Sequence, residues 1–242
     1  MIFDLIAGTG IAAEVVPWTP LELFKNGELG FWFDGSDNSL MWKESTGQLP
    51  TGQPGNLVAL WKNKINPASP YSVSQLTSGS CPVWQTTTVN YDGAGDTLSK
   101  TALTLASNSG MTLAVGAAVK VASVSNVRFI SFSAGDSVLF TTPNGVTANF
   151  NGRGFNGTIP LSLVQPNTII VTSQANLVPI TIRMDGVEQT DSAAGTAGLA
   201  FDQIVLLEGA AKQANISQVV FVNRVLSAQE IAQLEAYIGS KQ

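Results

Sequence analysis

The sequence predicts an all-β protein, an antiparallel β-sandwich with an irregular N-terminal arm and leader and one C-terminal helix. From about residue 71, short runs rich in Val, Ile, Thr and Phe alternate with turns rich in Gly, Pro and Asn. Apolar residues fill every second position from Val178 to Met184, and an Asp-Gly turn follows, which is typical of a hairpin with one buried face. Regularly spaced short strands of this kind favour a sandwich.

The first 17 residues are expected to form a docking arm, because they are mostly apolar and end at Pro17. Apolar side chains at the start of this arm would anchor it on another subunit: Ile2, Phe3, Leu5 and Ile6. Residues 18–70 are expected to form an irregular leader that packs on the sandwich, since prolines and glycines interrupt residues 47–70 repeatedly. Within it, Thr19 and Pro20 indicate the start of a short helix, and residues 56–63 one strand.

The sandwich body is expected to span residues 71–242 and to end in a helix over residues 227–239. Ser227 and Glu230 match the S-x-x-E capping box that begins a helix, and Gly239 stands where a helix C-cap favours glycine. One apolar stripe follows from the helical spacing of Ile231, Leu234 and Ile238. The preceding strand is apolar on both faces from Val219 to Val222, as expected for a central strand.

The charge pattern excludes one large class of partner. Charged residues make up 12% of the chain, against roughly 25% in ordinary soluble domains. The net charge is −5, and the 12 Lys and Arg residues form no cluster that would neutralise phosphates, so we expect no nucleic acid. A polar but weakly charged surface is common where a protein meets other subunits.

Histidine and cysteine usage bounds the chemistry. The chain has no histidine, which removes the usual serine-nucleophile triad and nearly all zinc chemistry. The single cysteine, Cys81, cannot form an intrachain disulfide, and no cationic neighbour in the sequence would activate its thiol. We therefore expect Cys81 to be a small buried side chain, and we expect no cofactor.

The N-terminus does not match a signal peptide, because it lacks a positive first region and Asp4 interrupts its apolar run. No stretch reaches 18 apolar residues, so we expect no membrane span. The sequence thus predicts synthesis in a cytoplasm without export by a signal peptide.

Three stretches resemble concanavalin A-like, laminin G-like jelly rolls. They are "VNYDGAGDTLS" at 89–99, "ITIRMDGVEQ" at 180–189 and "ISQVVFVNRVLSAQEIAQLEAYIGSK" at 216–241. The resemblance implies a jelly-roll sandwich over most of residues 71–242.

The leader at 18–63 resembles a segment that precedes such jelly rolls in structural proteins of tailed bacteriophages. The matching elements are Phe33-Asp34, Ser36-Asp37, Ser39-Leu40, Glu44-Ser45 with Gly47, and Gly52-Gln53-Pro54. This sequence departs from the pattern at "INPASPYSVSQL", where such proteins have a Gly- and Asn-rich loop. Within the leader, Asp34 and Asp37 are expected to accept hydrogen bonds from nearby backbone N–H groups. Trp32, Trp42 and Trp61 are expected to pack against one face of the sandwich.

The sequence is compatible with two kinds of binding site. Asp92 and Asp96 flank Gly-Ala-Gly and are weak calcium candidates, as in some laminin G-like domains, although a plain turn is the favoured interpretation. A glycan site would use aromatic rings with polar edges. Its candidates are Trp84, Tyr91 and, in the glycine-rich loop 149–157, Phe150, Arg153 and Phe155.

Glycoside hydrolysis is the enzymatic alternative, because glucanases share this fold. The reaction needs two carboxylates roughly 5 to 9.5 Å apart. No expected strand carries two acids on one face, and the E-x-D-type signature of those glucanases is absent, so we expect no enzyme.

Together, the resemblances imply a non-enzymatic structural protein of a phage virion, made in the host cytoplasm, and most simply a capsid decoration protein. Its partners would be other capsid or tail subunits, and symmetry favours a homo-oligomer, with a trimer as the first expectation. The alternative is a tail-fibre or receptor-binding component that recognises host glycans.

Overall fold

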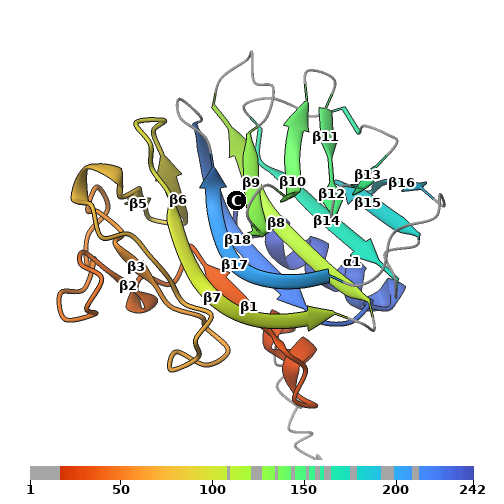
Figure 1. The fold of residues 1–242 in the computed structure, drawn as a ribbon, viewed down its shortest axis with the longest axis horizontal. Helices are drawn as coiled ribbons and strands as arrows, with labels where there is room; N and C mark the ends of the chain where they lie inside the picture. The colour runs from red at the N-terminus through yellow and green to blue at the C-terminus, as the bar shows by residue number, and fades with distance from the viewer. Residues whose placement is uncertain are drawn as a thin grey trace, which may run out of the picture.

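The structure is a computed structural model of the chain. It describes residues 17–107, 110–120, 127–133, 136–142, 145–150, 153–155, 159–160, 165–174, 179–191, 199–208 and 213–242. Two antiparallel sheets face each other across one core, which confirms the predicted β-sandwich (Figure 1).

One sheet, sheet A, holds eight strands. Its order is β16 (Val187–Asp191), β15 (Ile180–Met184), β14 (Asn167–Ser173), β8 (Met111–Val119), β18 (Ala214–Val222), β6 (Thr88–Tyr91) and β5 (Val83–Gln85), and β1 (Gly30–Asp34) also pairs with β18.

The facing sheet, sheet B, also holds eight strands. Its order is β11 (Gly145–Thr147), β10 (Asp136–Thr142), β9 (Arg128–Ser133), β17 (Leu199–Glu208), β7 (Leu98–Ser107), β4 (Val73–Ser74), β3 (Leu60–Trp61) and β2 (Met41–Trp42). A separate pair joins β12 (Asn149–Phe150) to β13 (Arg153–Gly154).

Local patterns explain the clearest strands. In β15, buried and half-buried residues alternate as predicted, and Asp185 and Gly186 form the turn to β16 with positive φ angles of 45° and 85°. In β18, all residues from Val219 to Val222 are buried, because one face meets the core and the other is covered by a helix.

The leader departs from the prediction of an irregular segment, since it supplies strands to both sheets. β1 pairs with β18 from Gly30 opposite Val222 to Asp34 opposite Gln218, while β2 and β3 extend sheet B. At Gly30 a Cβ would lie 2.1 Å from the carbonyl oxygen of Phe221, so only glycine permits this pairing. The predicted strand over residues 56–63 is confined to Leu60–Trp61.

The two helices that the sequence predicts are both present. The short helix of the leader is a 3-10 turn, η1 (Pro20–Phe24), and two further 3-10 turns are η2 (Asn38–Leu40) and η3 (Ser78–Ser80). The C-terminal helix, α1 (Ala228–Gly239), begins with the predicted Ser227–Glu230 capping box. Its C-cap is Ser240, so Gly239 is the last helical residue rather than the cap.

An outer cluster attaches α1 and η1 to the outer face of sheet A. Leu234 and Ile238 of α1 pack with Ala114, Ile170 and Val220 of the sheet. Leu23 and Phe24 of η1 and Trp32 of β1 belong to the same cluster. The N-terminal leader and the C-terminal helix therefore lie side by side on one face of the sandwich.

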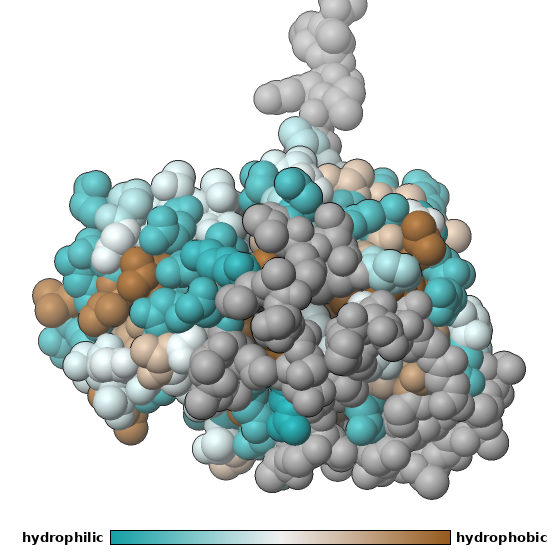
Figure 2. Space-filling model, turned by 90° about the horizontal axis from the view of Figure 1, so that it is seen from above, coloured by the Kyte–Doolittle hydropathy of each residue, from teal (hydrophilic) through white to brown (hydrophobic). Residues whose placement is uncertain are grey.

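Of the helices described, none has the length and apolar character needed to cross a bilayer. The surface seen in Figure 2 is mostly hydrophilic where it is described, and hydrophobic residues form small spots there. The exposed large hydrophobic residues come from separate segments: Leu21, Leu29, Leu49, Leu76 and Val187.

Candidate functional site

Three residues expected to contact a glycan are buried, which corrects that expectation. Trp84, Tyr91 and Phe155 are only 6%, 0% and 7% exposed. Alternation along β6 turns Tyr91 into the core, and the indole N–H of Trp84 donates to the Gly35 carbonyl at 2.9 Å. None of the three rings can therefore stack on a sugar.

Other expected site residues lie outside the described parts of the structure. The backbones of Phe150 and Arg153 belong to β12 and β13, but their side chains are not among those described. The four docking residues of the arm, Ile2, Phe3, Leu5 and Ile6, precede the first described residue.

The calcium candidates Asp92 and Asp96 form a hydrogen-bonded turn. The Asp92 N–H donates to Asp96 Oδ2 at 2.8 Å, and the Ala94 N–H donates to Asp92 Oδ1 at 2.8 Å. Burial raises the pKa of Asp96, and the neighbouring Asp92 carboxylate acts in the same direction. Within the described residues no group of three potential metal ligands gathers here, and both carboxylates already serve the turn.

The acidic residues of the leader form a structural cluster. Asp34 is 1% exposed and accepts hydrogen bonds from the Ser36 N–H at 3.0 Å and from Gln218 Nε2 at 2.7 Å. Lys64 Nζ lies 2.7 Å from Asp34 and 2.9 Å from Asp37. Burial opposes ionisation of Asp34, but hydrogen bonds from Lys64, Ser36 and Gln218 outweigh it and hold its pKa below the ordinary value. The predicted backbone hydrogen bonds to Asp34 and Asp37 are confirmed.

The tryptophans of the leader do not share one face, contrary to the prediction. Trp61 lies in the core between the sheets. Trp32 lies in the outer cluster, because successive side chains of β1 point to opposite faces of sheet A. The Trp32 indole donates to Gln218 at 2.8 Å, and Lys64 lies 4.7 Å from its ring centre. Trp42 is partly exposed with Lys62 over its ring.

A groove beside α1 is the site that the sequence did not predict. We call its first part the tyrosine section. It has a volume of about 500 Å³ and lies between the start of the leader and the exposed side of α1. Its walls include Trp18, Thr19, Gln233, Tyr237, Ser240 and Lys241.

Aromatic rings form the wall of the tyrosine section. Trp18 meets Tyr237 edge to face with 6.2 Å between ring centres, and Tyr237 meets the buried Trp32 in the same way at 5.8 Å. Lys241 Nζ lies 5.3 Å from the Tyr237 ring centre. Burial raises the pKa of Tyr237 to about 12, with the Asp34 carboxylate acting in the same direction, so its hydroxyl stays protonated at neutral pH.

The second part of the groove, which we call the arginine section, has a volume of about 310 Å³. Trp18 and Gln233 line both sections. The arginine section also includes Glu22 and Lys25 from η1 and its C-cap, and Gln229 and Glu230 from the first turn of α1. We call the two sections together the α1 groove.

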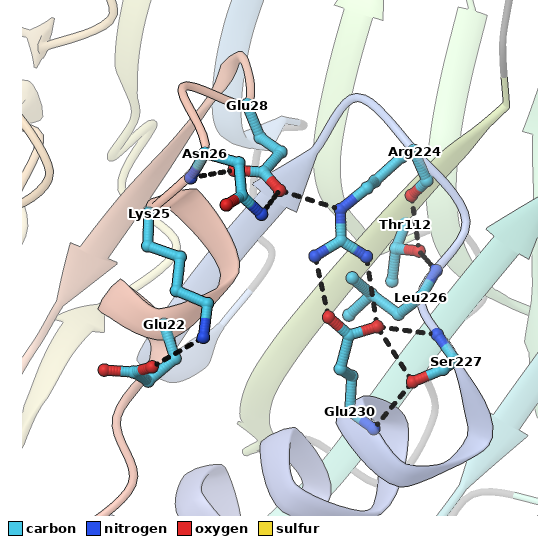
Figure 3. A network of polar contacts seen from close by, with 9 residues as sticks. All are labelled: Glu22, Lys25, Asn26, Glu28, Thr112, Arg224, Leu226, Ser227 and Glu230. Carbon is cyan, nitrogen blue, oxygen red and sulfur yellow. Dashed lines mark hydrogen bonds and ion pairs between the residues drawn. The ribbon is translucent and has the colours of Figure 1, made fainter.

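Arg224 joins the two sides of the arginine section (Figure 3). Its guanidinium donates two hydrogen bonds to Glu230, at 2.7 and 3.0 Å, and lies 3.4 Å from Glu28. The hydrogen bonds from Arg224 lower the pKa of Glu230 to about 2, and the Ser227 N–H adds to the effect. Glu22 pairs with Lys25 at 3.3 Å.

These geometries suit binding better than acid–base chemistry. Glu230 is held ionised and hydrogen-bonded, so it cannot supply a proton at neutral pH. What the α1 groove offers a ligand is an aromatic wall with amide, hydroxyl and ammonium groups at its edges. One signal in the sequence points to this site: Tyr237 lies outside the apolar stripe of an amphipathic helix.

Comparisons with known proteins identify the fold. No protein-family model and no curated protein matches the sequence. Among solved structures, Trypanosoma rangeli sialidase in complex with sialic acid superposes with a TM-score of 0.58 and 11% identity, over 89% of this chain and 34% of that one.

Two receptor-binding structures of botulinum neurotoxin also match. The receptor-binding domain of the C/D mosaic serotype gives a TM-score of 0.55 and 11% identity, over 74% of this chain and 48% of that one. The binding domain of type DC in complex with SialylT gives 0.52 and 12%, over 75% and 48%. The chain thus spans about a third of the sialidase and about half of each toxin domain, and it has a concanavalin A-like sandwich fold.

Proposed function

We propose that this chain is a non-catalytic glycan-binding module and that the α1 groove is its binding site. The observation that carries the proposal is the Trp18–Tyr237 pair, which forms an aromatic wall in a groove of about 500 Å³ bordered by Gln233, Ser240 and Lys241. Aromatic faces contact the apolar sides of sugar rings, and the polar groups beside them pair with hydroxyls.

The structural neighbours support the class of ligand. One sialidase structure contains sialic acid, and one toxin binding domain is in complex with SialylT. Because identity is only 11–12%, these neighbours support a sandwich that can carry a glycan site, and the location proposed here rests on this chain's own residues.

The ion pairs of the described carboxylates near the groove support the non-catalytic part of the proposal. Glu230 is bound by Arg224, and Glu22 by Lys25. Most glycoside hydrolases need one protonated and one ionised carboxyl group at the bond that is cleaved. Incubation of the purified protein with the bound glycan should release no reducing ends.

The setting we propose is a tailed-bacteriophage particle, in which the chain acts as a receptor-binding component. This setting rests on the resemblance of residues 18–63 to a segment of phage structural proteins. The second candidate is a capsid decoration protein that acts through protein contacts. The low charged fraction of 12% favours it, since such surfaces suit subunit contacts. A particle map would place the protein on the tail or on the head, and would reveal whether it is a trimer.

Glycan binding is tested by a glycan array followed by calorimetric titration of the best ligand. Trp18→Ala should weaken binding at least about tenfold, or about 1.4 kcal/mol, because it removes one half of the aromatic wall. Trp42→Ala is the matched control, since Trp42 is a partly exposed tryptophan of sheet B outside the groove. Circular dichroism verifies that both variants fold. The proposal is wrong if no glycan binds at millimolar concentration, or if Trp18→Ala binds as the wild type does.

A further inference from the structure

The two sections of the α1 groove adjoin each other, because Trp18 and Gln233 line both of them. The residues that α1 contributes lie along one side of the helix, from Gln229 at its start to Ser240 at its C-cap. At 1.5 Å per residue, this side is about 16 Å long. A groove of that length is too extended for a single sugar ring to fill.

The two sections differ in the chemistry they present. In the arginine section the charges of Glu22, Lys25 and Glu230 are used in ion pairs, so the section has ionic groups but little unpaired charge. In the tyrosine section, Lys241 forms no ion pair with any residue that the structure describes, and its ammonium lies above the Tyr237 ring. A ligand crossing Trp18 therefore passes from a section of paired charges to an aromatic section that holds the Lys241 ammonium.

We infer that the ligand of the α1 groove is an extended oligosaccharide that lies along α1 and crosses Trp18, with uncharged units in the arginine section. This inference rests on the proposed glycan binding and adds the length and orientation of the ligand. Gln229 and Gln233, spaced one helical turn apart, both line the arginine section and carry amide groups for successive units, and Trp18 lines both sections. Hydroxyl-bearing units match amides, since both donate and accept hydrogen bonds.

The test is a length series of the oligosaccharide that the array selects, from the disaccharide to the hexasaccharide, titrated against the full chain. Affinity should rise at least about tenfold with length and then reach a plateau once the ligand spans both sections. Gln229→Trp fills the arginine section, so it should remove the gain in affinity that comes with ligand length.

Ala232→Trp is the matched control, because Ala232 is exposed on α1 and lines neither section. It should preserve the full dependence on length. If the disaccharide binds as tightly as the hexasaccharide, or if Gln229→Trp keeps the gain, the extended ligand is ruled out while glycan binding stands. If no oligosaccharide of any length binds, both proposals fall together.

Discussion

At the scale of single residues, the acids of the leader hold the chain together rather than bind a ligand. Asp34 accepts hydrogen bonds from Ser36 and Gln218 and pairs with Lys64, which itself lies over the Trp32 ring. Each polar group of this cluster thus compensates the burial of another. Trp32 in turn contacts Tyr237, so the cluster supports one wall of the α1 groove.

Replacing Asp34 by Asn should lower the free energy of unfolding by about 3 kcal/mol, because it leaves Lys64 partly buried beside fewer counter-charges. Urea denaturation at pH 7 measures the change. Asp37→Asn serves as the control and should cost less than about 1 kcal/mol, since the Asp37 side chain is 28% exposed. Equal losses of unfolding free energy in the two variants would show that the burial of Asp34 does not determine the cost of removing its charge.

At the scale of elements, α1 depends on one carboxylate with several partners. Glu230 completes the capping box with Ser227 and also accepts two hydrogen bonds from Arg224. The same carboxylate therefore begins the helix and links it to the end of β18 and, through Arg224, to Glu28 of the leader. α1 forms one wall of the groove, so its anchoring maintains the site.

The pH dependence of stability should reflect the ionisation of Glu230. The pKa of Glu230 is about 2 in the folded protein against an ordinary 4.5, so the unfolded chain binds more protons between these values. The stabilisation is complete above about pH 4.5 and is lost as the pH falls towards 2. Thermal unfolding at pH 6 and pH 3 should show a smaller acid-induced drop in Tm for Glu230→Gln than for the wild type.

Glu22→Gln provides the comparison, because the Glu22 side chain is 53% exposed in a surface pair with Lys25. Its drop in Tm between the two pH values should equal that of the wild type. An unchanged drop in Glu230→Gln would contradict the role assigned to the Arg224–Glu230 contact.

At the scale of the whole molecule, the leader is an integral part of the sandwich. It adds β1 to sheet A and β2 and β3 to sheet B, and it places Phe31, Phe33 and Trp61 in the core between them. It also forms the wall of the α1 groove that faces the helix. The leader therefore cannot be separated from the jelly roll without exposing the core of both.

A chain that starts at Tyr71 should not reach a folded state, because burial of each large core side chain of the leader contributes roughly 1.5–3 kcal/mol. A chain that starts at Pro17 keeps every described contact and should fold. Near-ultraviolet circular dichroism and the dispersion of amide resonances distinguish the two outcomes. A well-folded chain lacking residues 1–70 would show that the leader is an appendage.

The sequence predicted features whose signals are local and missed those that need distant partners. Alternation in β15, the Asp185–Gly186 turn and the capping box of α1 depend on neighbouring residues, and each is present. The strands of the leader are short, and β1 owes its hydrogen bonds to β18 near the other end of the chain. Prolines and glycines surround these short strands, so no local pattern in the sequence identifies them.

The candidate site was missed for a related reason. Composition identified aromatic residues as sugar contacts, but it could not tell which rings are accessible. Trp84 and Tyr91 are turned inward by their strands, whereas Trp18 and Tyr237, from opposite ends of the sequence, meet at the surface. Accessibility is a property of the packed molecule.

By itself, the sequence determined an antiparallel sandwich with a capped C-terminal helix, and turns in which Asp34 and Asp37 accept backbone hydrogen bonds. Periodicity and capping act over a few residues, so they can be followed along the chain. Only the tertiary structure decided that the leader completes both sheets and that Trp18 and Tyr237 form a groove. Those outcomes depend on hydrogen bonds and packing between segments far apart in the chain, which no local pattern encodes.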